Sequence, residues 1–343
     1  MKKISVYLSL FIVSLFSISC TLVDHQIEPG PDVYITGVEE SNGLFTGQYW
    51  KNGKSVRLLT SPTLVYPTAI AVSGNDVHVV GWVNDQKSQA VGVHWKNGKL
   101  VDFAKLRPSF LSDVAVSGND VYIAGQGVDH ANYSYATYWK NGEAVTLENS
   151  IGGWARAVLP SGSDIYAAGS FWNGTVTVAT YWKNGKSFKL TDGTKPAIAN
   201  AIAVLGDDVY VVGIESNMVG NENAGSIQIA KCWKNGVEIP LTDGKNYSEA
   251  NDITIVGNDV YIAGKEDIGT LNAAKYWKNG KPIALNGGLV GVGISAFNND
   301  IYIVGGTYIG SNGVGLYWKN EQPVYLTDVS KNSYLSSILV KNP

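Results

Sequence analysis

Four polar side chains could move protons or stabilise charge in a reaction: Asp113, Asp252, Arg156 and His130. Each lies where an internal repeat of the chain is broken. Two carboxyl groups, helped by a cation or an imidazole, can supply the general acid and base that cleave a glycosidic bond. The distances between these groups do not follow from the sequence, so a polysaccharide hydrolase or lyase remains one hypothesis.

Established catalytic motifs are absent from the sequence. It contains no Gly-x-Ser-x-Gly elbow, no His-Glu-x-x-His zinc motif and no closely spaced cysteine pair. The Gly-rich run at 287–293 leads into a predicted strand rather than a helix, which argues against a phosphate-binding loop. The sequence therefore favours a protein that is not an enzyme and that needs no cofactor or metal.

Aromatic side chains outside the repeats suggest a binding surface. Trp82, Trp154 and Trp172 fall outside the repeated positions, and Tyr133 lies in a nearby variable segment. Flat exposed rings stack on sugars or anchor peptide side chains, although they can equally cover the tops of the sheets. Polar groups expected beside them complete a candidate ligand-binding set of Arg156, Asn200 and Asn251.

Charge excludes one class of partner. The 343-residue chain has a formal net charge of −3, and loss of Lys2 and Lys3 would make it more negative. A protein that binds nucleic acid or anionic lipid headgroups needs a broad positive field, which this chain lacks. We expect a monomer that binds a glycan or a protein and does not bind nucleic acid.

The first twenty residues predict export and lipid attachment. Lys2 and Lys3 precede an apolar run of thirteen residues, Ile4 to Phe16, which is too short to span a bilayer. Ser19 directly before Cys20 resembles the lipobox of bacterial lipoproteins. The resemblance implies cleavage after residue 19, lipidation of Cys20 and a tether over 20–31. It also implies a bacterial cell envelope protein at the outer membrane or cell surface.

Two short sequence motifs recur through the chain, and both indicate the same number of repeat units. Trp-Lys-Asn occurs seven times, and Asp-Val/Ile-Tyr occurs seven times with His78 replacing one Tyr. The Trp positions are 50, 95, 139, 182, 233, 277 and 318, and the Asp positions are 32, 76, 120, 164, 208, 259 and 300. Successive Asp residues lie 41 to 51 residues apart. Such a period indicates a repeat architecture rather than the two domains that length alone suggests.

Each unit predicts four short antiparallel strands. In the second copy, apolar runs at 70–72, 76–81, 90–95 and 100–104 are separated by turn residues, including an Asn-Gly pair typical of a type I′ hairpin. Seven such units match a seven-bladed β-propeller over residues 32–343. The chain opens on a second strand, and Ser336–Val340 matches a first strand, so we expect the C-terminal strand to complete the N-terminal blade.

The repeat resembles bacterial extracellular HAF-type repeats, through Ala-x-x-Trp-Lys-Asn-Gly followed by a strand that ends in Gly. Its Asp-Val-Tyr-Ile-Ala-Gly core is also similar to kelch blades, although only Gly305-Gly306 has the double glycine of that family. The resemblance implies a secreted propeller and leaves the activity open.

Residues that repeat in every unit are expected to build the blade. We assign the seven Trp to the core between blades and the seven Asp to capping of backbone N–H groups in turns. His78, His94 and Cys232 replace repeated Tyr residues and are expected to be packed side chains. Loops that vary lie on one face of the ring.

Seven aligned positions, one at the start of each first strand, should line the central channel on the variable face: Thr68, Ser112, Arg156, Asn200, Asn251, Val292 and Ser336. Asp113 and Asp252 directly follow two of them, where most units have a small residue. A water-filled channel that tolerates polar groups explains them as well as a binding site does. The main expectation is a surface-anchored, non-catalytic recognition propeller. The alternatives are the hydrolase or lyase at the channel mouth and a structural envelope scaffold.

Overall fold

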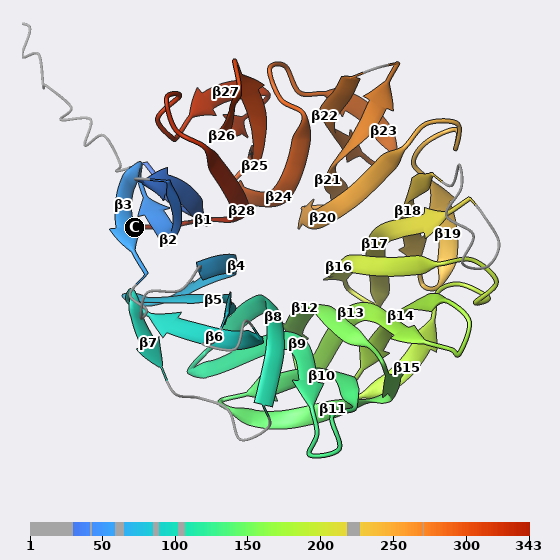
Figure 1. The fold of residues 1–343 in the computed structure, drawn as a ribbon. Helices are drawn as coiled ribbons and strands as arrows, with labels where there is room; N and C mark the ends of the chain where they lie inside the picture. The colour runs from blue at the N-terminus through green and yellow to red at the C-terminus, as the bar shows by residue number, and fades with distance from the viewer. Residues whose placement is uncertain are drawn as a thin grey trace, which may run out of the picture. The chain divides into compact units, whose positions relative to one another are not determined.

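The computed structural model describes residues 30–41, 43–58, 65–84, 89–101, 107–217, 227–269 and 271–343. The predicted leader, the lipid-attachment residue Cys20 and the tether up to residue 29 lie outside them. Residues 31–343 form one compact unit of twenty-eight strands, arranged as seven four-stranded antiparallel sheets around a central axis (Figure 1). No helix that could cross a membrane occurs in the described part of the chain. The seven-bladed β-propeller prediction is confirmed.

The strands fall into four concentric sets. The innermost strands are β28 (Ser333–Lys341), β4 (Val65–Ser73), β8 (Arg107–Ser117), β12 (Trp154–Ser161), β16 (Ala197–Leu205), β20 (Ser248–Val256) and β24 (Val290–Phe297). The second strands are β1 (Asp32–Ser41), β5 (Asp76–Asn84), β9 (Asp120–Val128), β13 (Asp164–Trp172), β17 (Asp208–Ser216), β21 (Asp259–Ile268) and β25 (Asp300–Ile309). The third strands are β2 (Leu44–Lys51), β6 (Ala90–Lys96), β10 (Ser134–Lys140), β14 (Thr177–Lys183), β18 (Gln228–Lys234), β22 (Leu271–Lys278) and β26 (Asn312–Lys319). The outer strands are β3 (Lys54–Arg57), β7 (Lys99–Val101), β11 (Glu143–Ile151), β15 (Lys186–Lys189), β19 (Val237–Pro240), β23 (Lys281–Ala284) and β27 (Gln322–Tyr325).

The two ends of the described chain share one blade. Blade 1 has the order β28-β1-β2-β3, and β28 pairs antiparallel with β1 through partners such as Val33 and Val340. Blades 2 to 7 follow around the ring and begin with β4, β8, β12, β16, β20 and β24. This pairing confirms the predicted closure and leaves no open edge between the first and last units.

Trp side chains fill the junctions between blades, as predicted. All seven repeat Trp are at most 3% exposed. Seven apolar clusters each join two neighbouring blades; in one, Trp233 of blade 5 packs with Ala168 and Ala179 of blade 4. Burying a large apolar ring contributes ~2–3 kcal/mol, so the repeated Trp hold neighbouring blades together without disulfides.

The two recurring strings form one turn network, and this corrects the role we expected for Asp. In blade 3, the Asp120 Oδ2 pairs with Lys140 Nζ at 2.8 Å and its Oδ1 accepts from Asn141 Nδ2 at 2.7 Å. Asn141 Oδ1, rather than the Asp carboxylate, accepts the backbone N–H of Val121 at 2.9 Å. Asn141 has φ 50°, as the type I′ turn requires.

The residues that replace repeated Tyr are buried, as expected. His78 Nδ1 and His94 Nε2 lie 2.9 Å apart with stacked rings, and each side chain is 5% exposed. Burial lowers the pKa of both, that of His94 to about 4. Cys232 is buried, which raises the pKa of its thiol to about 12, so this cysteine is an unreactive packing residue.

Candidate functional site at the channel mouth

Every innermost strand carries a β-bulge, and the bulged residues are the seven positions aligned from the sequence. The register shifts between Pro67 and Ala69 in β4, for example, which leaves Thr68 without a partner in β5. The shift recurs in the other six blades at Ser112, Arg156, Asn200, Asn251, Val292 and Ser336. These residues lie inside the strands, two to five residues past their starts, and not at the starts as expected. A bulge turns the strand and re-aims its side chains.

Four of the bulged side chains bond the next blade. Ser336 donates to the carbonyl of Pro67 at 2.8 Å, and Thr68 donates to that of Leu111 at 2.9 Å. Asn200 and Asn251 donate in the same way, at 2.9 Å and 3.0 Å, to the carbonyls of Ala250 and Gly291. Each acceptor is the residue just before the next bulge, so equivalent hydrogen bonds join neighbouring blades at four of the seven junctions around the channel.

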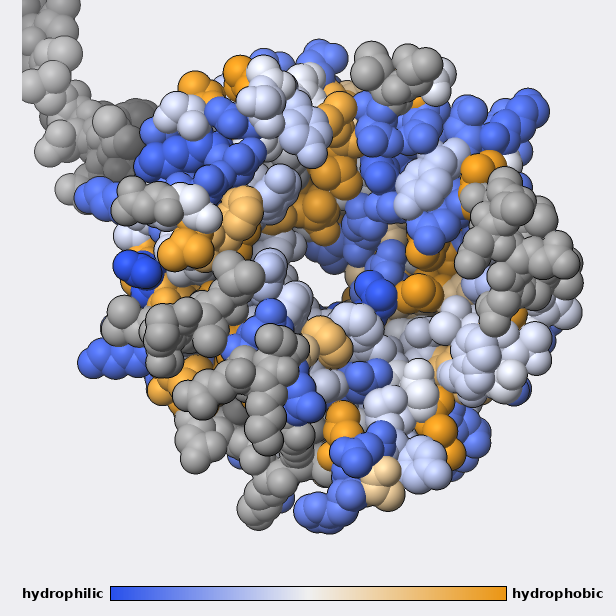
Figure 2. Space-filling model, in the orientation of Figure 1, coloured by the Kyte–Doolittle hydropathy of each residue, from blue (hydrophilic) through white to orange (hydrophobic). Residues whose placement is uncertain are grey.

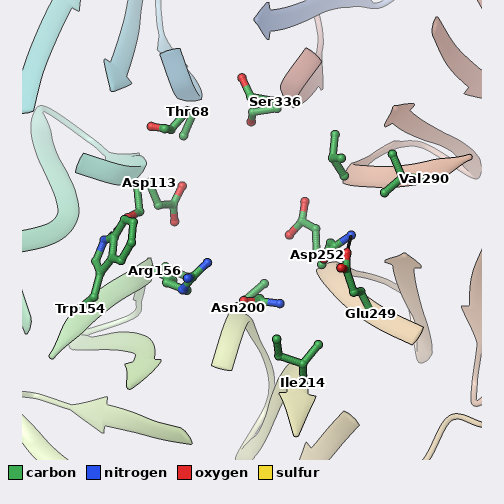
Figure 3. A pocket seen from close by; sticks show the side chains of 17 residues that line it. Thr68, Asp113, Trp154, Arg156, Asn200, Ile214, Glu249, Asp252, Val290 and Ser336 are labelled. Atoms are coloured by element: carbon green, nitrogen blue, oxygen red, sulfur yellow. Dashed lines mark hydrogen bonds between the residues drawn. The ribbon is translucent and has the colours of Figure 1, made fainter. Parts of the chain in front are cut away.

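A polar cavity of about 520 Å³ lies inside this ring. Figure 2 shows the central opening with hydrophilic residues on part of its rim, and Figure 3 shows the lining side chains. The lining residues are Thr68, Ala69, Ser112, Asp113, Trp154, Arg156, Ala157, Asn200, Ala201, Ile214, Glu249, Asn251, Asp252, Val290, Val292, Ser336 and Ser337. A cavity of this size accommodates a small polar ligand or the end of a chain.

Asp113 and Asp252 lie on opposite sides of this cavity, and both carboxyl groups point into the space between them (Figure 3). Each carboxylate bridges two blades. Asp113 accepts the N–H of Val114 in its own strand at 2.8 Å and that of Val158 in the next blade at 2.9 Å. Asp252 accepts from Ile253 and from Ile294 of the next blade, both at 2.8 Å.

Burial dominates the protonation of this pair. It raises the pKa of Asp113 to about 6, against the lowering effect of its two backbone N–H donors. Burial also raises the pKa of Asp252 to about 7, and the charge of Asp113 adds to that increase. Two carboxyl groups whose pKa values lie near neutrality and differ from one another can serve as base and acid in one reaction.

Arg156 reaches the cavity on the side of Asp113 (Figure 3). Its guanidinium lies 4.8 Å from the ring centre of Trp154, and the Trp154 indole N–H donates to Ser112 Oγ. Arg156 Nε is buried without a hydrogen-bond partner in the described structure, and burial lowers the guanidinium pKa. Arginine stacked on an aromatic ring keeps its donor edge free for a ligand.

Glu249 also lines the cavity, and sequence reasoning missed it. The residue precedes the bulged Asn251 by two positions, so its side chain shares the same face of the strand. Glu249 Oε1 accepts from Tyr247 Oη at 2.5 Å and lies 3.5 Å from Lys265 Nζ. Extending the internal alignment two residues upstream would have found it, because Tyr66, Phe110 and Trp154 hold the equivalent places.

Two of the three predicted binding tryptophans belong to a row of packed aromatic rings. Trp82 stacks on Tyr66 with ring centres 4.1 Å apart and meets the edge of Phe110 at 5.5 Å. Phe110 in turn lies 5.3 Å from Trp154, which carries the Arg156 guanidinium. The rings lie on blades 2 to 4, and Trp154 at the end of the row packs against the guanidinium of Arg156. They therefore contact one another instead of forming a free binding surface.

Three other predicted residues are not brought to the cavity. Trp172 at the end of β13 is 42% exposed, and Tyr133 in the turn before β10 is 60% exposed. His130 is exposed in the same turn and does not line the cavity, so the structure does not place it beside the carboxyl pair. Among the described residues, no group of three or more His, Cys, Asp or Glu side chains could hold a metal ion.

Fold and cavity together define a seven-bladed β-propeller with a polar site at its channel mouth. Neither a protein-family model nor a curated protein sequence matches the chain. Similar solved structures include a puromycin-hydrolysing peptidase from Mycobacterium tuberculosis, at 13% identity and TM-score 0.56 over 88% of this chain and 53% of that one. The present chain therefore spans about half the length of that peptidase.

A second similar structure is the β-propeller domain of the Trilobed protease from Pyrococcus furiosus, described as having an open velcro topology. It is 10% identical with TM-score 0.54, over 88% of this chain and 96% of that one. A mutant of the Trypanosoma rangeli sialidase that displays trans-sialidase activity matches more weakly, at 10% identity and TM-score 0.41 over 84% of this chain and 66% of that one. At these identities the comparisons establish the propeller fold alone.

The expectation of a non-catalytic recognition propeller was wrong. Two of the similar structures are a peptidase and the propeller domain of a protease. The aromatic rings on which that expectation rested are largely packed on one another, whereas the alternative site at the channel mouth is an assembled cavity.

Proposed function

We propose that the protein is a hydrolase or lyase that cleaves a polysaccharide at the mouth of its central channel. The observation that carries this proposal is the position of Asp113 and Asp252 on opposite walls of one polar cavity, with pKa values raised to about 6 and about 7. A substrate seated between them would have a proton donor on one side and a proton acceptor on the other.

The two pKa values suggest the roles. Asp252 holds its proton to higher pH and is the better general acid, and Asp113 ionises first and is the better general base. In hydrolysis, the glycosidic C–O bond breaks and Asp252 gives its proton to the leaving oxygen. Water gives its hydroxyl to the sugar carbon and its proton to Asp113. In elimination, Asp113 would instead remove a proton from the ring carbon next to the one that carries the glycosidic oxygen. A C=C bond would form between these two carbons, the C–O bond would break, and Asp252 would protonate the leaving oxygen.

The surroundings of the pair suit a hydroxyl-rich substrate. Ser337, Ser112 and Thr68 present hydroxyl groups in the same cavity, and Ile214 and Val290 supply small apolar surfaces. Sugars present alternating hydroxyl groups and C–H faces, so this mixture of donors, acceptors and apolar contacts supports a carbohydrate.

Cellular context forms part of the proposal. We propose that the mature protein is a lipid-anchored monomer of the bacterial cell envelope, attached through Cys20 at the outer membrane or cell surface, and that it does not bind nucleic acid. We also propose that its blades belong with the HAF-type and kelch-like repeats that they resemble. Incorporation of labelled palmitate into wild-type chain, and its loss in Cys20→Ala, would test the anchor.

Other blades provide conservative variants for testing the carboxyl pair. Ala69, Ala157 and Ala201 occupy the position of Asp113 and Asp252 in blades 2, 4 and 5. Asp113→Ala and Asp252→Ala therefore introduce a residue that the fold already accommodates. Turnover is measured as release of reducing ends, and as formation of unsaturated sugar, from a panel of neutral and acidic polysaccharides.

We expect each substitution to lower turnover by roughly 100-fold or more while the variant remains folded, which cooperative thermal unfolding would show. Asp207→Ala removes an exposed carboxyl group in the turn between β16 and β17, outside the cavity, so it is the control and should retain turnover. Absence of wild-type turnover on the whole panel, or full activity in both Asp variants, would overturn the proposal.

A further inference from the structure

Arg156 is the exception in the ring of bulged residues. Five of the seven positions hold Ser, Thr or Asn, and four of these donate to the carbonyl of the next blade. Arg156 makes no such bond: within the described structure its Nε is buried and unpartnered, and its guanidinium lies over the face of Trp154. Leaving a buried Nε–H group without an acceptor is costly. At this position, therefore, the hydrogen bond to the next blade is replaced by a cation with an unused donor.

Neighbouring carboxylates do not neutralise this cation. Both oxygens of Asp113 accept backbone N–H groups, and no ion pair joins Asp113 to Arg156. Asp252 is occupied in the same way and lies on the opposite wall (Figure 3). Glu249 is held by Tyr247 and Lys265. Among the described lining residues, Arg156 therefore carries the positive charge that lacks a partner.

The guanidinium is also held in place. Its plane rests against Trp154, whose indole N–H is bonded to Ser112 and whose ring packs on Phe110. A guanidinium fixed by stacking loses little freedom when it binds a planar carboxylate through two N–H groups. Sulfate and phosphate esters are tetrahedral rather than planar, and a phosphate monoester carries up to two negative charges, so a single arginine beside two acidic groups suits them less well than a carboxylate.

We propose that the substrate is an acidic polysaccharide and that Arg156 is the specificity-determining residue that binds the carboxylate of a uronic acid unit. This inference rests on the proposed function and names its substrate class. The carboxylate would lie against Arg156, on the side of the cavity that holds Asp113, which places the neighbouring glycosidic bond between Asp113 and Asp252. Neutral sugars would leave the buried Nε–H of Arg156 without a charged acceptor and would bind more weakly.

Chemically matched ligands test the carboxylate directly. Trimers of galacturonate, guluronate, mannuronate and glucuronate are titrated by calorimetry against the full chain, beside the methyl esters of the same trimers. We expect at least one acid to bind and its ester to bind roughly 10- to 100-fold more weakly, as loss of a charge-assisted hydrogen bond predicts.

Arg156→Asn is the decisive variant because Asn200 and Asn251 hold the same position in blades 5 and 6. It should lose the preference for the acid and bind acid and ester alike, and Arg156→Lys should retain part of it. Arg57→Gln, an exposed arginine on the outer strand β3, is the control and should bind as wild type does.

Binding and cleavage separate the two proposals. Binding that depends on Arg156 without cleavage would support the carboxylate site and overturn the proposed reaction. Cleavage of neutral polysaccharides with no acid preference would support the reaction and overturn the carboxylate site. Equal binding of acid and ester by wild type, binding of no acid, or unchanged preference in Arg156→Asn would each overturn this inference.

Discussion

The Asp252 carboxylate reaches across a blade junction and accepts the backbone N–H of Ile294 at 2.8 Å, while its other oxygen accepts the N–H of Ile253 in its own strand. Asp113 makes the equivalent bridge to Val158. The described residues show no such side-chain acceptor for Ile70, Ile202 or Ile338 at the same place in other blades. Bridging is therefore optional for the fold, and the two carboxylates are available for another purpose.

Turnover should depend on pH through both carboxyl groups. The base requires Asp113 ionised, and its pKa is about 6; the acid requires Asp252 protonated, and its pKa is about 7. We expect a narrow bell-shaped profile of kcat/KM with its maximum between these values, each limb belonging to the coupled pair rather than to one residue. A profile that stays flat from pH 5 to pH 8 would contradict this assignment.

The free energy of unfolding should also depend on the raised pKa values of Asp113 and Asp252, and it should fall as pH rises. A carboxyl group whose pKa is higher in the folded state favours folding most when protonated, so its contribution declines as pH rises from about 4 through about 7. Relative to the Asp113→Ala/Asp252→Ala variant, wild type should lose up to ~3 kcal/mol per carboxyl group over this range. Urea unfolding of both proteins at pH 4 and pH 8 measures the difference. A difference that does not change with pH would contradict the prediction.

The buried pair His78 and His94 should make the folded state less stable as pH falls, which is opposite to the effect of the two carboxyl groups. Burial lowers the pKa of His78 and brings that of His94 to about 4, so these groups favour the folded state above the ordinary histidine pKa and destabilise it as pH falls. We expect His78→Tyr/His94→Tyr, which restores the repeated residues, to gain ~2–3 kcal/mol over wild type between pH 8 and pH 4. Thermal unfolding across that range provides the measurement, and parallel curves for the two proteins would refute it.

Asn141 should matter more to stability than the neighbouring Lys140. Substitution Asn141→Ala removes the bonds to Asp120 and to the Val121 N–H and places a β-carbon at φ 50°. We expect a loss of ~1–3 kcal/mol in the free energy of unfolding. Lys140→Ala removes an exposed ion pair and should cost less. Equal effects of the two substitutions in denaturant unfolding would show that the charge, and not the turn geometry, stabilises the hairpin.

Repetition explains how much of the fold could be predicted. Seven copies of one pattern averaged out local ambiguity, so strand number, blade number and ring closure all followed from the positions of Trp and Asp. Strand ends did not: β4 begins at Val65, whereas the apolar run began at Ile70. The extra residues contain the bulge at Thr68, and a bulge leaves no signature in a hydrophobic pattern because it depends on pairing with β5.

The sequence indicated polar residues at the channel mouth, where the cavity lies, but it assigned the main role to aromatic side chains. Comparing units identified Arg156, Asp113 and Asp252, because each departs from the residue that other blades hold there. Which residues pack on one another could not be read in the same way: Trp82 and Trp154 looked like a free binding surface until their contacts with Phe110 were known. Burial also sets the carboxyl pKa values, and it depends on the closed ring rather than on neighbouring residues in sequence.

Closure of the ring has a consequence for how the molecule is made. Ser336 bonds to the carbonyl of Thr36, a residue 300 positions earlier, so blade 1 lacks its innermost strand until nearly all of the chain has left the ribosome. Blades 2 to 7 contain only strands that are neighbours in sequence and can form as synthesis proceeds. Joining the two ends is the most distant pairing in the molecule and therefore the slowest step that topology imposes. Until β28 is in place, β1 and β24 each expose a side that the β28 segment of another copy could occupy. Placement of β28 therefore decides whether a nascent chain closes its own ring or associates with a neighbouring chain.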